Sequence, residues 1–306
     1  VPMAPKSAIF TAMTRRAVST LLYVVIAIAG SLPVVFAQSS EGIREVMAVR
    51  DAFPHRVSTV GFRGGEWALQ MDGRWYYWAD GRFLPADLRD QAQEFVSIRF
   101  YNYQTGPWQP REITASLELR LRERTRQRYN DQRQRFNSFL DSLYQVSSQR
   151  EADQLMRSVT FLGMRTRVHP NVVEPLQRVE RRINNAMLDH QETRSFVRNL
   201  SQVHGYHWRN ISGTTRRSYH AYGMAVDLVP QRWGGGWGYW QWAADGGVED
   251  WWNIPFEQRW NVPQTVIDAF EAEGFVWGGK WLFFDNVHFE YRPEVLILSQ
   301  RVRAAG

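Results

Sequence analysis

Two histidines and one carboxylate stand in a spacing that suits a catalytic metal site. Residues 218–227 read Ser-Tyr-His-Ala-Tyr-Gly-Met-Ala-Val-Asp, which places His220 and Asp227 on either side of a glycine. A second histidine, His288, lies far downstream in the segment Asp-Asn-Val-His-Phe-Glu at 285–290. Two imidazoles and one carboxylate are what a catalytic zinc ion takes from a protein when its fourth position stays open for water. The sequence therefore predicts a Zn2+ site formed by His220, Asp227 and His288.

Two further carboxylates flank the downstream histidine. Glu290 follows His288 by two residues, so both side chains point to the same face if the segment is an extended strand. Asp285 shares that face only if the chain turns before His288. Either carboxylate could take a proton from a bound water and later deliver it to a leaving amine.

The ordered motifs resemble those of the zinc D-alanyl-D-alanine carboxypeptidase and L-alanyl-D-glutamate endopeptidase family, which cuts the peptide stems of the bacterial cell wall. The resemblance covers roughly residues 200–295, including Gly-Tyr-His-Trp-Arg at 205–209 and Gly-Phe-Val-Trp-Gly-Gly-Lys-Trp at 274–281. It implies a zinc metallopeptidase that hydrolyses bonds in peptidoglycan stem peptides, first of all as a D-alanyl-D-alanine carboxypeptidase. The alternatives are the endopeptidase activity of the same family and a non-catalytic, zinc-containing protein that binds the cell wall.

The resemblance also implies roles for the acids near the last ligand. In this family the acid three residues before the last zinc histidine is the general base, a role that falls here on Asp285. Glu290 is the rival, because it has the right chemistry and the simpler geometry. The carboxylate that is not the base would orient His288 or the substrate.

A positive group is needed as well, because a zinc ion must serve both the water and the scissile carbonyl. The family places an arginine before the first ligand, and Arg209 is the residue that matches. Its gap to His220 is short, however, and Arg216 and Arg217 lie closer.

The N-terminal segment predicts export. Basic residues after Met13 precede an apolar run at 17–36, and small and polar residues follow up to Ser40. This is the pattern of a signal peptide over residues 1–37, in which residues 1–12 are an over-long start. The expected location is periplasmic or envelope-associated. The alternative is an uncleaved anchor, which would be the protein's only contact with a membrane.

Net charge and cysteine content limit the kinds of partner and ligand that the protein can have. The formal net charge is +6 and the pI is about 9.7, yet no nucleic-acid motif accompanies this charge. An anionic cell wall or membrane face is the better expectation. Cysteine is absent, which excludes disulfides and thiolate zinc ligands.

Hydrophobic patterning predicts an α+β fold. A small antiparallel sheet should carry the zinc site with helices packed on one side, preceded by a β-hairpin and helical N-terminal region. The expected domains are residues 38–160, with Asp-Gly hairpin turns in 57–85 and a long helix at 111–148, and the peptidase domain 161–306 around a core of 200–295. We further expect this helix to pair with one at 172–202. The Trp- and Gly-rich stretch 232–252 is either a loop that closes over substrate or a loop whose tryptophans are buried.

Overall fold

The structure is a computed structural model that describes residues 41–98, 100–127 and 134–305. The expected signal peptide at 1–37 lies outside these residues. Among the described helices, none is both long enough and apolar enough to cross a membrane. The fold is α+β, with small antiparallel sheets and packed helices, as the sequence predicted.

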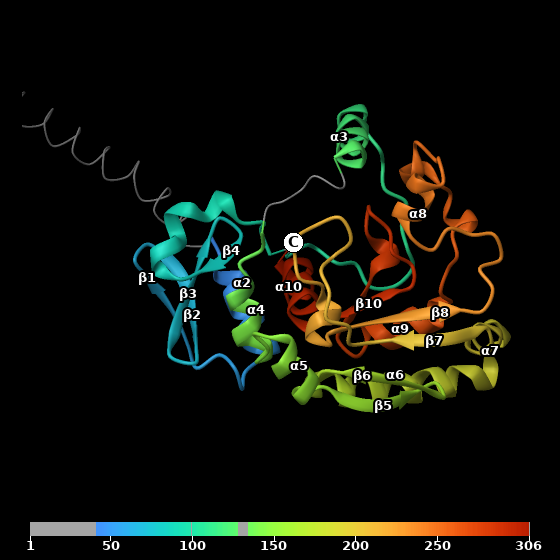
Figure 1. Ribbon diagram of the computed structural model, residues 1–306, viewed down its shortest axis with the longest axis horizontal. Coiled ribbons are helices and arrows are strands. Elements are labelled where there is room, and N and C mark those ends of the chain that lie inside the picture. The colour runs from blue at the N-terminus through green and yellow to red at the C-terminus, as the bar shows by residue number, and fades with distance from the viewer. Residues whose placement is uncertain (1–40, 99, 128–133, 306) are drawn as a thin grey trace, which may run out of the picture.

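The sheet that carries the predicted metal ligands, called the metal-bearing sheet below, has four antiparallel strands in the order β7-β8-β10-β9. Helix α6 lies below this sheet in Figure 1 and packs against α7 and α9. Phe270 of α9 stacks on Phe289 of β10 with ring centroids 3.9 Å apart, so apolar packing closes this side. The elements run as follows: α6 Pro170–Asp189, α7 Gln191–Arg198, β7 Leu200–His204, β8 Ala225–Pro230, α9 Gln264–Glu271, β9 Phe275–Trp277 and β10 His288–Tyr291.

A second four-stranded sheet forms the N-terminal meander that the Asp-Gly pairs predicted. Asp72 and Asp80 both take left-handed φ angles, 49° and 45°, and each is followed by a left-handed glycine. Two successive residues of positive φ make the tight turn that matches the twist of a hairpin. The elements of this region are α2 Ile43–Ala52, β1 Thr59–Arg63, β2 Glu66–Met71, β3 Arg74–Ala79 and β4 Arg82–Leu84.

The two sheets share one hydrophobic core. Val46 of α2 and Phe83 of β4 belong to the same buried cluster as Val226 and Phe289 of the metal-bearing sheet. Helix α2 also packs against α10, Pro293–Ala305, which follows β10 directly. The expected domain boundary at residue 160 therefore runs through a continuous core.

The long helix expected at 111–148 is wrong. Gln145 takes a left-handed φ of 55°, which ends an α-helix, and the Ser148 hydroxyl then accepts a hydrogen bond from the Glu151 amide at 3.3 Å to start the next one. The described residues of this stretch form two helices, α3 Ala115–Arg126 and α4 Asn137–Tyr144, and a third, α5 Gln149–Leu155, begins just beyond it.

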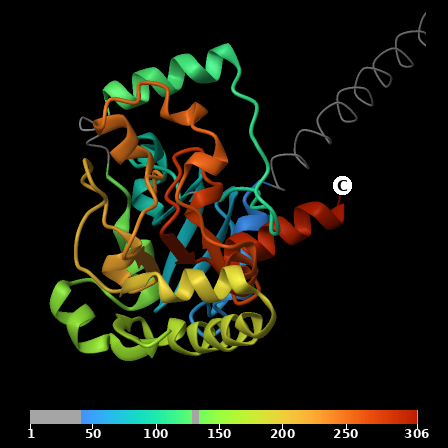
Figure 2. The ribbon, with the colours of Figure 1, turned by 90° about the vertical axis from the view of Figure 1, so that its right-hand side faces the viewer.

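The second expected helix, at 172–202, is also shorter than predicted. His190 leaves the helical region with φ −108° and ψ 105°, so α6 and α7 are separate helices and β7 begins at Leu200. Helix α6 packs against α9 and against β5, Arg157–Phe161, instead of pairing with a single long helix. Figure 2 shows α3 and α6 on opposite sides of the molecule.

An extended arm, residues 100–106, connects the N-terminal region to the metal-bearing sheet. The Tyr103 hydroxyl donates to Glu271 at 2.5 Å and accepts from the Trp277 amide at 3.0 Å. Lys280 donates to the carbonyl oxygen of Gln104 at 2.9 Å. Buried, charge-assisted bonds of this kind hold the arm in one register along β9. Residues from before position 107 thereby become part of the wall of the site.

Candidate metal centre

Three elements bring the predicted metal ligands together. His220 lies in a 3-10 helix, Tyr219–Tyr222, that begins where the Ser218 hydroxyl accepts a hydrogen bond from the His220 amide. Asp227 follows in β8, and His288 opens β10 directly opposite Asp227 in the antiparallel register. Gly223 makes the turn into β8 with a φ of 63°, and a Cβ there would stand 2.6 Å from a backbone nitrogen. Glycine is therefore required between the first two ligands.

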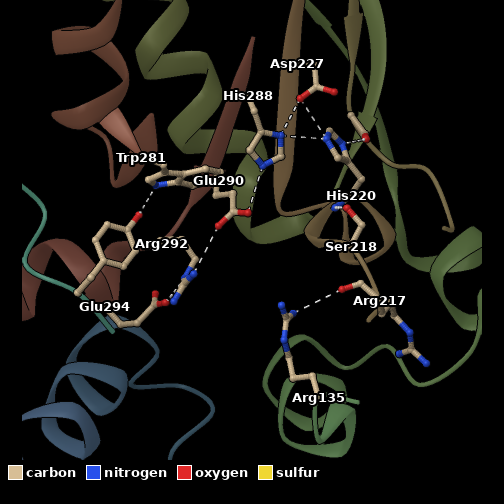
Figure 3. Close-up of polar contacts among 12 residues, drawn as sticks. Arg135, Arg217, Ser218, His220, Asp227, Trp281, His288, Glu290, Arg292 and Glu294 are labelled. Atoms are coloured by element: carbon tan, nitrogen blue, oxygen red, sulfur yellow. Dashed lines mark hydrogen bonds and ion pairs between the residues drawn. The ribbon is translucent and has the colours of Figure 1, made fainter. Parts of the chain in front are cut away.

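The ligand atoms of His220, Asp227 and His288 lie within 4.8 Å of one another. Asp227 Oδ1 is 3.1 Å from His220 Nε2 and 2.7 Å from His288 Nδ1, and these two nitrogens are 3.2 Å apart (Figure 3). Both imidazoles are buried. The convergence of the three side chains from different elements is what the sequence motif predicted.

Outer partners fix which nitrogen of each histidine faces the centre. His220 Nδ1 lies 2.6 Å from the Gly205 carbonyl oxygen, which can only accept, so the neutral ring carries its proton there and offers Nε2 inward. His288 Nε2 lies 3.1 Å from Glu290 Oε1, which leaves Nδ1 as its inward atom. Two imidazole nitrogens and one carboxylate oxygen thus face one point, a donor set that fits Zn2+.

The electrostatics of the site call for a positive charge at this point. Burial lowers the pKa of His288, but its hydrogen bonds to Asp227 and Glu290 outweigh burial and raise that pKa well above the usual range. Burial conversely raises the pKa of Asp227, yet the two histidines outweigh it and hold this pKa well below the usual range. A divalent cation would supply the charge that the site otherwise holds as a proton.

A chain of buried charges extends from His288 into the protein. Glu290 accepts from His288 and lies 3.4 Å from Arg292 Nη1, and Arg292 Nε donates to Glu294. The Arg292 guanidinium also stacks over the Tyr219 ring at 4.9 Å, next to the other histidine ligand. This places Glu290 where an outer partner orients a metal-binding histidine. Sequence motifs did not reveal Arg292, whose role depends on the side chains around it.

We expect Arg292→Lys to weaken zinc binding by about 10-fold, the lower end of the range for loss of an outer partner. Lysine keeps the charge but lacks the planar fork that contacts Glu290 and Glu294 together. Zinc affinity is measured by competition with a chromophoric chelator. Arg178→Lys is the matched control, because Arg178 pairs with Glu273 on the distant helical side. Wild-type affinity in Arg292→Lys would show that the charge chain does not support the ligand.

Asp285 lies in the turn before β10 and lines the cleft together with His288. Burial raises its pKa to about 7; His288 and Arg209 favour the charged form, while Asp227 opposes it. A carboxyl group that titrates near neutrality is suited to both take up and release a proton. Unlike Glu290, Asp285 forms no side-chain hydrogen bond to either histidine among the described residues, because the turn between Asp285 and His288 interrupts the strand alternation.

The three arginines considered from the sequence have different surroundings. Arg209 is exposed and lines the cleft beside the ligands. Arg217 is bound to Asp141 at 2.5 Å and turns its guanidinium over the Trp208 ring at 4.5 Å. Arg216 is buried in the cleft wall. Of the three arginines, Arg209 is therefore the one that is both exposed and part of the cleft lining.

The cleft at the metal centre has a volume of about 1170 Å3. Its far wall includes Tyr101 of the arm, whose hydroxyl accepts from Trp281 Nε1 at 2.8 Å, and Trp281 in turn packs on the His288 ring at 5.6 Å. The Trp-rich stretch 232–252 holds tryptophans in two different environments. Trp251 is fully buried, whereas Trp242 lines the cleft with 46% of its surface exposed.

The fold and the three converging side chains define a small antiparallel sheet that carries a candidate metal centre. Residues 212–291 match the family model described as D-alanyl-D-alanine carboxypeptidase, and residues 45–100 match a domain of unknown function. No curated protein and no solved structure matches the chain. The first match includes all three ligands and both flanking acids. It places this region of the chain in the peptidase family that the sequence motifs predicted.

Proposed function

We propose that the protein is a zinc-dependent peptidase that hydrolyses peptide bonds in peptidoglycan stem peptides, with D-alanyl-D-alanine carboxypeptidase action as the first choice. The observation that carries the proposal is the convergence of two imidazoles and one carboxylate in an open cleft beside Asp285. Structural zinc sites close the shell with four protein ligands, whereas three leave a position for water. Among the described residues the ligand group has three members, which supports catalysis over the wall-binding alternative.

The residues of the chain would divide the chemistry as follows. A zinc ion held by His220, Asp227 and His288 would supply Lewis acidity to a water and to the scissile carbonyl. Asp285 accepts a proton on its carboxylate and returns it to the departing amine. Glu290 holds the His288 ring in place through Nε2. Arg209 offers its guanidinium to the carbonyl oxygen or a substrate carboxylate.

Digestion of purified muropeptides, followed by mass spectrometry, tests the proposal. We expect the zinc-loaded protein to release D-alanine from stem peptides and to lose this activity when a chelator removes the metal. Cleavage between L-alanine and D-glutamate would instead identify the endopeptidase of the same family. Because a pocket shaped for D-centres leaves polar groups unpaired with L-residues, an unstructured all-L protein should be spared. Retained zinc with no product from any muropeptide would favour the wall-binding alternative.

A further inference from the structure

A second cleft, of about 600 Å3, also reaches the metal centre. Its walls are the hairpin of β5 and β6, Met164–Val168, and the segment that leaves β7 at residues 203–209. His220 and Asp227 line both this cleft and the larger one. A peptide that occupies both clefts would therefore cross the metal ligands.

Positive charge borders this second cleft. Arg165 and Arg167 project from β6, and Arg209 stands where the two clefts meet. Arg165 is exposed, and Arg167 lies 5.0 Å over the Tyr206 ring with its nearest carboxylate, Asp153, at 3.7 Å. Asp227 also lines the cleft but belongs to the candidate metal site, and three guanidinium groups outnumber these two carboxylates. The cleft is therefore suited to a ligand that carries negative charge.

Two kinds of polar group add to this character. The Thr166 hydroxyl is buried in the cleft wall and has no hydrogen-bond partner among the described residues. His204 and His207 also line the cleft and are exposed. Arg165 and Arg167 share one face of β6, because side chains alternate along a strand. Planar guanidinium groups match the geometry of a carboxylate, which accepts several hydrogen bonds at once.

We propose that this second cleft binds a carboxylate-bearing part of the substrate peptide, and that Arg165 and Arg167 determine this specificity. The inference rests on the proposed peptidase function and specifies which part of the substrate the second cleft recognises. Both arginines lie on a hairpin outside the segment 212–291 that matches the peptidase family. Their role is therefore a property of this chain's own hairpin.

Stem peptides offer two sources of the carboxylate, the C-terminus and the α-carboxyl group of D-glutamate. Matched synthetic peptides separate them: one pair with a free or amidated C-terminus, and one pair with D-glutamate or its α-amide. Charge-assisted bonds predict that one acid form is bound about 10- to 100-fold better than its amide. The pair that shows this preference identifies the group that occupies the second cleft.

The variants test which residues create the preference. Arg165→Gln with Arg167→Gln should reduce it to within about threefold, while zinc content and turnover of the amidated peptide stay near wild type. Arg165→Gln alone should reduce this preference in part. Because the Arg165 side chain is exposed, the single variant replaces the double variant in the test if the double variant does not fold. Arg157→Gln is the matched control, because it lies on the same hairpin but does not line the cleft.

Affinity is measured by calorimetry on zinc-loaded protein carrying Asp285→Asn, so that binding is separated from turnover. An unchanged preference in the double variant, an equal loss in Arg157→Gln, or no preference for either acid would overturn the inference. If wild-type protein hydrolyses no muropeptide but binds the acid peptide through Arg165 and Arg167, the proposed function fails and the subsite stands. If the wild-type protein hydrolyses muropeptides but shows no preference for either acid peptide, the proposed function stands and the inference about the second cleft fails.

Discussion

His220→Ala and His288→Ala proteins should be purified without zinc and without peptidase activity. Each histidine supplies one of three ligands, and its loss should weaken metal binding by more than the ~10–100-fold that loss of an outer partner causes. Both rings are buried at the cleft end of their sheet and lie outside the α-helices, so α-helical content should be retained. Metal content by mass spectrometry and far-UV circular dichroism measure the two properties.

His55→Ala is the control for the loss of a histidine, because His55 is exposed in the N-terminal region. It should keep both the zinc and the activity. Near-stoichiometric zinc in a His220→Ala, His288→Ala double variant would show that the metal binds elsewhere. Unfolding of the single variants, seen as a loss of the circular dichroism signal, would instead mean that the rings serve packing.

Asp285→Asn should keep its zinc and lose catalysis by about 10²-fold or more, the usual contribution of a general base. Asparagine preserves the shape of the side chain but cannot accept the proton. The structure separates this effect from ligation, because Glu290, not Asp285, contacts His288 Nε2. Steady-state kinetics on the best muropeptide, with zinc content measured on the same sample, checks the expectation.

Glu290→Gln is the matched acid-to-amide control. It should weaken zinc binding, because a neutral amide oxygen accepts the Nε2 proton of His288 more weakly than a carboxylate does, while protein reloaded with zinc should recover most of its turnover. A greater loss of turnover in zinc-loaded Glu290→Gln than in Asp285→Asn would reverse the roles of the two acids.

The choice between these two acids shows where the sequence reached its limit. Residue spacing put Glu290 on the same strand face as His288. It allowed Asp285 to share that face only if the chain turned before His288. The structure begins β10 at His288, which puts Asp285 in that turn and in the cleft wall. Both facts support Asp285 as the base, and the assignment stays a prediction until the two variants are compared.

The sequence by itself determined the features that depend on neighbouring residues. The ligand types, the glycine between the first two ligands and the Asp-Gly hairpins are local, because each is set by side-chain chemistry or backbone φ within a few positions. Strand alternation likewise predicted that His288 and Glu290 share a face. The structure brings these residues together as expected.

Only the tertiary structure decided what depends on contacts between distant segments. The helical pattern at 111–148 gave no sign of the break at Gln145, because tertiary packing overrides helix propensity. The placement of Tyr101 beside Trp281, of Arg292 behind Glu290, and of the β5–β6 hairpin against the ligands likewise leaves no periodic trace in the sequence. Most of these partners are far apart along the chain, and the direction of the others depends on a single turn. Packing around the shared core therefore sets their positions.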